Sequence, residues 1–186
     1  MYKKFFIAVT FLVTTLAMQI NFCQAMPYSE MYLGGLTIGS SIDEMRRIYG
    51  EPTSHKWVIE VHNSYQYGNT VTIDYNGSNK KIGFITISAD NGWKTPRGLA
   101  VGDNISKALD MYGNPDYTQS GNFKTAYCYF HESYNTYSKM NVKDFGFVIL
   151  FNKESGKILQ LALWGDPSRM AGFDEYYQDS MKRLVE

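Results

Sequence analysis

The chain has 186 residues, with 18 basic and 18 acidic side chains, 15 tyrosines and 11 phenylalanines. This length suits one compact domain or two small ones. The balance of charge provides no electrostatic drive toward nucleic acid or an anionic membrane surface, so we expect neither as a partner.

The N-terminus is typical of a secretory signal peptide. Lys3 and Lys4 precede an uncharged, mostly apolar run from Phe5 to Ala17, which is too short to cross a hydrocarbon layer of about 30 Å. We predict that residues 1–25 are cleaved after Ala25 and that the mature protein is exported, periplasmic or extracellular, with no transmembrane segment. An uncleaved anchor helix is the alternative, which the short run disfavours.

Cleavage at this point changes the cysteine count and the charge. Cys23 leaves with the leader, so Cys128 remains alone and cannot form an intramolecular disulfide. The mature chain of 161 residues carries 16 basic and 18 acidic side chains, a net charge of −2. Packing of its many aromatic side chains is therefore expected to stabilise the fold.

A short helix is predicted directly after Ser41. Ser41 and Glu44 have the spacing of a capping box, while Gly50 in a left-handed conformation and Pro52 would end the helix. Its predicted buried face consists of Ile42, Met45 and Tyr49. Segments rich in β-branched and aromatic residues follow and predict strands. These strands are Lys56–Val61, Thr70–Tyr75 and Lys81–Ser88.

The same order of elements recurs in the second half. Asp103 or Asn104 can cap a second helix, which Gly113 would end. Its predicted buried face consists of Ile105, Ala108, Leu109 and Tyr112. The strands predicted after it are Thr125–Phe130, Asp144–Phe151 and Lys157–Trp164. A last helix is predicted within residues 167–186, where apolar residues recur at helical spacing, and it has no counterpart in the first half.

Internal duplication is the strongest signal in the sequence. Gly35–Pro52 and Gly98–Pro115 are identical at seven of eighteen positions at a constant offset of 63 residues, and the late strands match at an offset of 76. The second copy therefore carries 13 extra residues, which we place in the polar segment 131–143. The predicted organisation is repeat one over residues 26–97 and repeat two over residues 98–186, with superposable copies apart from that insertion.

Two known families share this pattern. A Gly-Leu-x-hydrophobic-Gly entry, a short helix ending in Tyr-Gly-x-Pro and antiparallel strands, all used twice, resemble the tandem-repeat β-lactamase inhibitory protein family. One copy alone resembles the small outer-membrane lipoproteins of the SmpA/BamE type. The resemblance implies an α+β fold of two tandem repeats, each a short helix followed by antiparallel strands. The strands of both copies would form one curved sheet, with the helices packed on one side and the other side free to meet a protein partner. The chain lacks the paired cysteines of the first family and the lipidated cysteine of the second.

The sequence contains no recognisable motif for catalysis or metal binding. His55, His62 and His131 are scattered, without the short spacing of metal ligands. The segment beginning at Asp74 imitates a calcium loop, but Ile85 stands where the bidentate glutamate is required. We therefore predict no metal, no cofactor and no enzymatic activity. An enzyme with dispersed catalytic residues is the least favoured alternative.

The leading functional hypothesis is a non-catalytic protein-binding module. Val148, Leu150 and Trp164 are predicted to alternate onto the sheet face opposite the core, and the inserted segment adds side chains that favour interfaces. The candidate partner-binding residues are Tyr127, Tyr129, Tyr134, Tyr137, Met140, Val148, Leu150 and Trp164. One alternative is that the C-terminal helix lies on this face, and another is that the insertion is a solvated hairpin tip. A carrier of a small ligand or cell-wall fragment, with tyrosines stacked on it, is the runner-up function.

Overall fold

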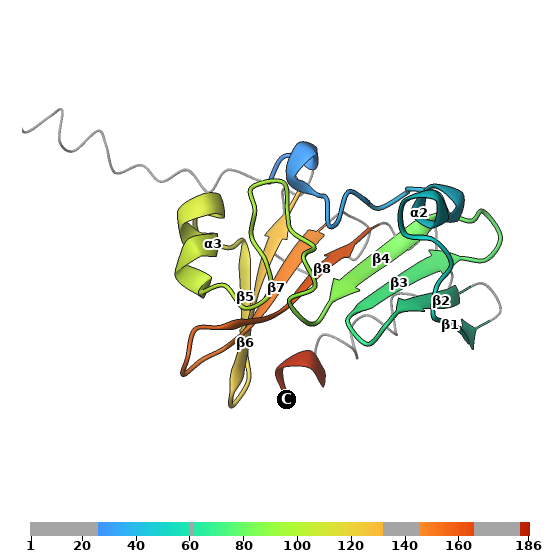
Figure 1. Cartoon of the computed structure of the whole chain (residues 1–186). Coiled ribbons are helices and arrows are strands. Elements are labelled where there is room, and N and C mark those ends of the chain that lie inside the picture. The colour runs from blue at the N-terminus through green and yellow to red at the C-terminus, as the bar shows by residue number, and fades with distance from the viewer. Residues whose placement is uncertain (1–25, 60–61, 132–145, 166–182) are drawn as a thin grey trace, which may run out of the picture.

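The computed structural model describes residues 26–59, 62–131, 146–165 and 183–186, which form an α+β fold around one eight-stranded antiparallel sheet (Figure 1). The helices are α2 (Ile42–Tyr49) and α3 (Ile105–Tyr112), and a 3-10 turn, η2, spans Tyr28–Glu30. The strands are β1 (Ser54–Ile59), β2 (His62–Tyr67), β3 (Val71–Asn76), β4 (Ile82–Ile87), β5 (Tyr117–Ser120), β6 (Lys124–Phe130), β7 (Gly146–Asn152) and β8 (Ile158–Trp164).

The strand order places the last strand of each half at the centre of the sheet. The order is β1-β2-β3-β4-β8-β7-β6-β5, so β4 and β8 pair with each other and β1 and β5 form the two edges. At this seam Phe84 lies opposite Trp164 and Ile87 lies opposite Leu161. Four consecutive strands thus follow each helix, and the two sets meet in a single sheet.

Both helices begin where the sequence predicts, and Asn104 rather than Asp103 is the N-cap of the second helix. Ser41 Oγ accepts a hydrogen bond from the Glu44 N–H at 3.1 Å and caps α2. Asn104 caps α3, because its side-chain oxygen accepts from the Ser106 N–H at 3.0 Å. The neighbouring Asp103 makes other contacts, described below.

The glycines that end the helices have a different conformation from the predicted one. Gly50 has φ 76° and ψ −161°, and Gly113 has φ 73° and ψ −159°. These angles lie outside the left-handed helical region, in a region that is essentially restricted to glycine. The two glycines therefore turn the chain away from its helix into an extended path, rather than closing the helix with a left-handed turn.

The predicted strands are confirmed to within two residues at the ends that the structure describes, but each half contains a fourth strand that sequence reasoning missed. β2 has the sequence HNSYQY and β5 has the sequence YTQS, and neither has the apolar alternation of a half-buried strand. Pairing with neighbouring strands makes them extended. The ends predicted at Val61 and at Asp144, most of the insertion 131–143 and most of the predicted C-terminal helix lie outside the described residues.

The main core lies between the helices and one face of the sheet, called here the helix face. Met45 of α2 and Ala108 of α3 are both fully buried in it, against alternate residues of the central strands. The sheet residues of this core include Ile73, Ile85, Ile149, Leu161 and Leu163. Because one apolar cluster contains residues of both helices, α2 and α3 cover the same face and leave the opposite face, called here the open face, without a helix from this pair.

Corresponding contacts fix each helix segment to its strands. The Gly39 N–H donates to Ile82 O at 2.7 Å, and the Gly102 N–H donates to Ile158 O at 2.9 Å. The hydroxyl of Tyr67 donates to the terminal glycine of α2, Gly50 O, at 2.9 Å. In the second half, Tyr129 OH donates to Gly113 O at 3.0 Å. The same backbone and side-chain connections thus occur in both halves.

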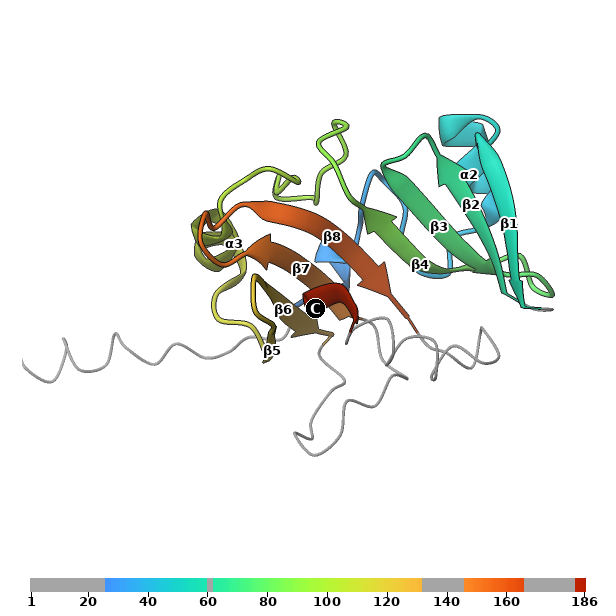
Figure 2. The same cartoon turned by 90° about the horizontal axis from the view of Figure 1, so that it is seen from below.

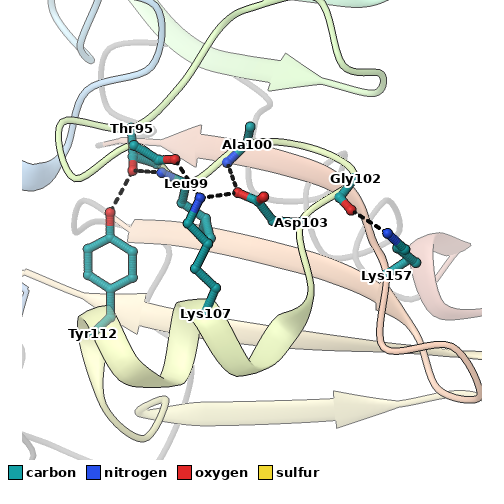
Figure 3. A network of polar contacts seen from close by, with 9 residues as sticks. Thr95, Leu99, Ala100, Gly102, Asp103, Lys107, Tyr112 and Lys157 are labelled. Carbon is teal, nitrogen blue, oxygen red and sulfur yellow. Dashed lines mark hydrogen bonds and ion pairs between the residues drawn. The ribbon is translucent and has the colours of Figure 1, made fainter.

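A polar network positions α3 in the second half (Figure 3). Asp103 Oδ2 accepts hydrogen bonds from the Ala100 N–H at 2.9 Å and from Lys107 Nζ at 2.7 Å. Lys107 Nζ also donates to Gly98 O, and Tyr112 OH donates to Thr95 Oγ1. These bonds hold the loop before α3 against the first and last turns of the helix.

Acid is expected to remove the contribution of Asp103 to stability. Burial alone would raise the pKa of its carboxyl, but the hydrogen bonds from Lys107 and the Ala100 N–H outweigh it, so the pKa is lowered. The contribution is therefore complete above the unfolded-state pKa of about 3.9 and is lost as the pH falls through the lower folded-state pKa. We expect Asp103→Asn to cost about 0.5–1 kcal/mol at about pH 7 and less at about pH 3, in urea unfolding experiments. An equal cost at both pH values would contradict this assignment.

Candidate functional site

The second half of the open face is an apolar surface built from alternate residues of β6, β7 and β8. Cys128 lies opposite Val148, which in turn lies opposite Ala162. Trp164 lies opposite Gly146, where the absence of a side chain leaves room for the indole ring. The ring of Phe130 meets that of Trp164 edge to face, with centroids 5.9 Å apart. This surface, called here the apolar half, comprises Ala126, Cys128, Phe130, Val148, Leu150, Ala162 and Trp164.

The first half of the open face is mostly polar. Thr72 lies opposite Thr86, and Asp74 lies opposite both Ser64 and Phe84 in the paired strands β2, β3 and β4. Phe84 is half-buried and packs against the apolar half from across the β4–β8 seam. The open face therefore changes from polar to apolar near the centre of the sheet.

The end of the chain contacts the apolar half. Residues 183–185 form a helical turn, and the side chain of Val185 is 4% exposed within the apolar cluster, with Leu184 half-buried beside it. Lys124 Nζ donates a hydrogen bond to Leu184 O at 3.3 Å. Figure 2 shows this turn against the strands of the second half. One alternative raised by the sequence is that the C-terminal helix lies on this face. Among the described residues, Leu184 and Val185 do contact it.

The structure brings three of the predicted partner-binding residues together. Val148, Leu150 and Trp164 share the apolar half, as their alternation predicts, and they are 2%, 5% and 2% exposed. Their side chains therefore already have neighbours in the free chain. Three other predicted residues, Tyr134, Tyr137 and Met140, lie outside the described residues.

Tyr127 and Tyr129, two of the candidate partner-binding residues, do not lie on the same face of the sheet as Trp164. Tyr127 lies opposite Ile149 and Tyr129 lies opposite Phe147, so both point toward the helix face. The ring of Tyr127 meets that of Phe151 edge to face at 4.8 Å, and Tyr129 is 3% exposed. The sequence does not show which alternate residues of β6 face the helices, because apolar residues occupy both of its faces.

Sequence reasoning missed an aromatic cluster on the helix face of the first half. The rings of Tyr65 and Tyr75 have centroids 4.7 Å apart, and the ring of His55 lies 4.9 Å from that of Tyr65. Arg46 Nη2 donates to Tyr65 OH at 2.8 Å, and His55 Nε2 lies 3.1 Å from Asn63 Oδ1. Burial raises the pKa of Tyr75, and its contact with Tyr65 adds to the effect.

This cluster is packed against itself rather than open to a ligand. Tyr65 and Tyr75 are only 6% and 3% exposed, so neighbouring side chains already cover their rings. Stacking of a small ligand on these tyrosines would first require their separation. No signal in the sequence could have indicated the cluster, because Tyr65 lies in the polar strand β2 that has no recognisable pattern.

Cys128 provides a chemical probe of the apolar half. Burial raises the pKa of its thiol to about 12, and the charge of Asp116 adds to the shift. The thiolate is the form that reacts with disulfide reagents. At about pH 8 we expect 5,5′-dithiobis(2-nitrobenzoate) to label the folded mature protein about a thousandfold more slowly than the unfolded protein. Equal labelling rates in the presence and absence of denaturant would show that Cys128 is accessible.

Within the described part of the chain, no group of three or more His, Cys, Asp or Glu side chains is arranged to hold a metal ion. No helix among the same residues is long and apolar enough to cross a membrane.

Comparison with known proteins identifies no family. No family model and no curated protein matches the chain. Among solved structures, the chain is similar to an extracellular protein containing an SCP domain from Bacillus anthracis str. Ames, with a TM-score of 0.48 and 10% identity over 81% of this chain and 50% of that one. It is also similar to a cysteine-rich secretory protein from Staphylococcus aureus subsp. aureus Mu50, with a TM-score of 0.46 and 10% identity over 76% and 47%. The chain spans about half the length of each of these proteins.

Proposed function

We propose that this chain is an exported, non-catalytic protein-binding module whose partner docks on the open face of the sheet. The observation that carries the proposal is the composition of this face, a polar half continuous with an apolar half across the β4–β8 seam. Protein interfaces combine an apolar centre with a polar surround in the same way. The packing of both helices on the helix face leaves the open face to other contacts.

We also infer that the module consists of two copies of one helix-plus-four-strand unit. Gly39 and Gly102, 63 positions apart in the sequence, have φ angles of 87° and 92°. The terminal glycines of α2 and α3 agree within a few degrees, and their carbonyls accept from Tyr67 and Tyr129 in the same way. This correspondence supports an internal duplication of the unit.

The proposed export follows from the N-terminal segment. The positive start, the apolar run and the cleavage position after Ala25 are those of a secretory leader. Met26, which directly follows the proposed cleavage position, belongs to the described fold, because its N–H donates to Phe130 O at 3.0 Å.

An affinity capture with charged variants tests the proposed face. The mature protein would be immobilised and exposed to the envelope and exterior fractions of its own source, alongside Thr72→Arg and Thr86→Arg. Both threonines are half-buried on the open face, and an arginine there should reduce recovery of a specific partner about tenfold or more. The matched control is Ile48→Arg, at a 41% exposed position on α2, which should leave recovery unchanged. Equal recovery by folded open-face variants would overturn the proposal.

A further inference from the structure

We propose that cleavage of the leader completes an ion pair at the start of the fold, in which the α-ammonium group freed at Met26 binds the carboxylate of Asp116 beside Phe130. The pair joins the first residue of the mature chain to the second half of the sheet. This inference rests on the proposed cleavage after Ala25, and it is independent of the proposed docking on the open face.

The backbone of Phe130, in β6, brings the two groups together. The Met26 N–H donates to Phe130 O at 3.0 Å, and the Phe130 N–H donates to Asp116 Oδ2 at 2.7 Å. The N–H and the C=O of one residue in an antiparallel strand point toward the same side of that strand. The Met26 nitrogen and the Asp116 carboxylate are therefore both held on the same side of one residue, next to each other.

Met26 and Asp116 occupy an edge of β6 that β5 does not cover. The pairing of β5 with β6 extends only as far as Cys128, two residues before Phe130. Asp116 directly precedes β5, and Met26 forms a parallel bridge with His131. An open strand edge pairs readily with other chains. The two residues thus close this part of the edge from the two ends of their own segments.

Contacts at and after Met26 fix the position of its nitrogen. The Met26 side chain is 3% exposed and belongs to the main core. The ring of Tyr28 meets that of His131 edge to face, with centroids 5.9 Å apart. Glu30 Oε1 lies 2.9 Å from Arg97 Nε. Because none of these contacts involves the residue before Met26, a chain that begins at Met26 should keep them.

Cleavage changes the charge and the number of donors at the Met26 nitrogen. Hydrolysis of the peptide bond after Ala25 consumes one water molecule and leaves a carboxylate on Ala25 and an ammonium group on Met26. Before cleavage the nitrogen is a neutral amide, whose one N–H donates to Phe130 O. An ammonium group has three donors, so one can keep this bond while another donates to Asp116. A hydrogen bond between charged groups is about twice as strong as one between neutral groups.

The acid dissociation constant of the Met26 α-amino group tests the pair directly. The neighbouring carboxylate should lower this constant about tenfold, so that the pKa lies above its ordinary range of about 7.7–8.0. The stabilisation is then complete below the ordinary pKa and is lost as the pH rises through the higher folded-state pKa. Other titratable groups packed nearby include His131, Tyr28 and Cys128. Substitution of Asp116 separates its effect from theirs.

Trace acetylation with acetic anhydride measures this constant, because only the neutral amine reacts. The mature protein beginning at Met26, its variants Asp116→Asn and Asp110→Asn, and a chain beginning at Ala25 would be compared, each with its first residue checked by intact mass. The amide oxygen in Asp116→Asn can still accept from the Phe130 N–H, and Asp110 is an exposed control on α3. We expect the tenfold effect in the mature protein and in Asp110→Asn. It should disappear in Asp116→Asn and largely disappear when Ala25 is kept.

Urea unfolding provides a second measure that also shows whether each chain is folded. At about pH 7, keeping Ala25 should lower the urea midpoint by roughly 0.5 M in the wild-type sequence and leave it unchanged in Asp116→Asn. An equal decrease in both backgrounds would overturn the ion pair. Dissociation constants within a factor of about two in the mature protein and in Asp116→Asn would overturn it as well.

The cleavage position is tested separately, by the intact mass of the chain that its source exports. A first residue other than Met26 would contradict the proposed cleavage and, with it, the completion of the pair by processing. A chain that does begin at Met26 but has an unshifted α-amino pKa would overturn this inference alone and leave the proposed export intact.

Discussion

Replacing Trp164 with alanine is expected to lower the free energy of unfolding by about 3–5 kcal/mol. The side chain is 2% exposed, packs against Phe130 and fills the space above Gly146. Its removal would leave a cavity that the surrounding strands cannot fill. Denaturant unfolding of the mature protein and the variant, followed by circular dichroism, measures the difference.

The result distinguishes a structural tryptophan from an exposed binding residue. Phe123→Ala provides the control, because Phe123 is 73% exposed and its replacement should change stability by less than about 0.5 kcal/mol. A cost below about 1 kcal/mol for Trp164→Ala would mean that the indole is exposed in solution rather than packed.

Valine at Gly50 or at Gly113 is expected to lower the free energy of unfolding by about 1–3 kcal/mol, and by nearly the same amount at the two positions. Both glycines have φ above 70° and ψ near −160°, a combination that a β-branched residue cannot adopt without strain. Nothing lies within 4 Å of the position of either added Cβ atom, so the cost comes from the backbone. Urea unfolding of both variants and of the double variant measures it.

Equality of the two costs is also a test of the duplication. The two positions follow different helices in the two halves of the chain, so the double variant should lose the sum of the two single effects. Glu154→Val, at an exposed turn residue, controls for the addition of an apolar side chain. Single effects that differ by more than about 1 kcal/mol would contradict equivalent helix ends in the two copies.

The parts of the fold that could be predicted depend on local sequence. Ser41 and Gly50 mark the two ends of α2 within the helix sequence itself, and the central strands carry continuous apolar patterns. β2 and β5 could not be predicted, because their polar sequences become strands only through pairing with neighbours. The strand β6 could be predicted, but its pairing decides that Cys128 lies on one face and Tyr127 on the other.

The candidate site was only partly predictable for a related reason. The alternation of β7 groups Val148 with Leu150 on one face, and this can be read from spacing alone. The contact between Lys124 and Leu184 joins residues 60 positions apart, and no periodicity encodes it. Gly121 gives no sign in the sequence that it accommodates the carbonyl of Val185. The contact of the C-terminal residues with the apolar half could therefore not be predicted from the sequence.

The most direct test of partner docking on the open face is photocrosslinking from defined positions. The mature protein would carry p-benzoylphenylalanine in place of Phe84, half-buried on the open face, or in place of Ile48 on α2. After irradiation with the envelope and exterior fractions of its source, we predict a discrete protein adduct from position 84 and none from position 48. Adducts from position 48 alone, or none from either position in folded protein, would contradict docking of a protein partner on the open face.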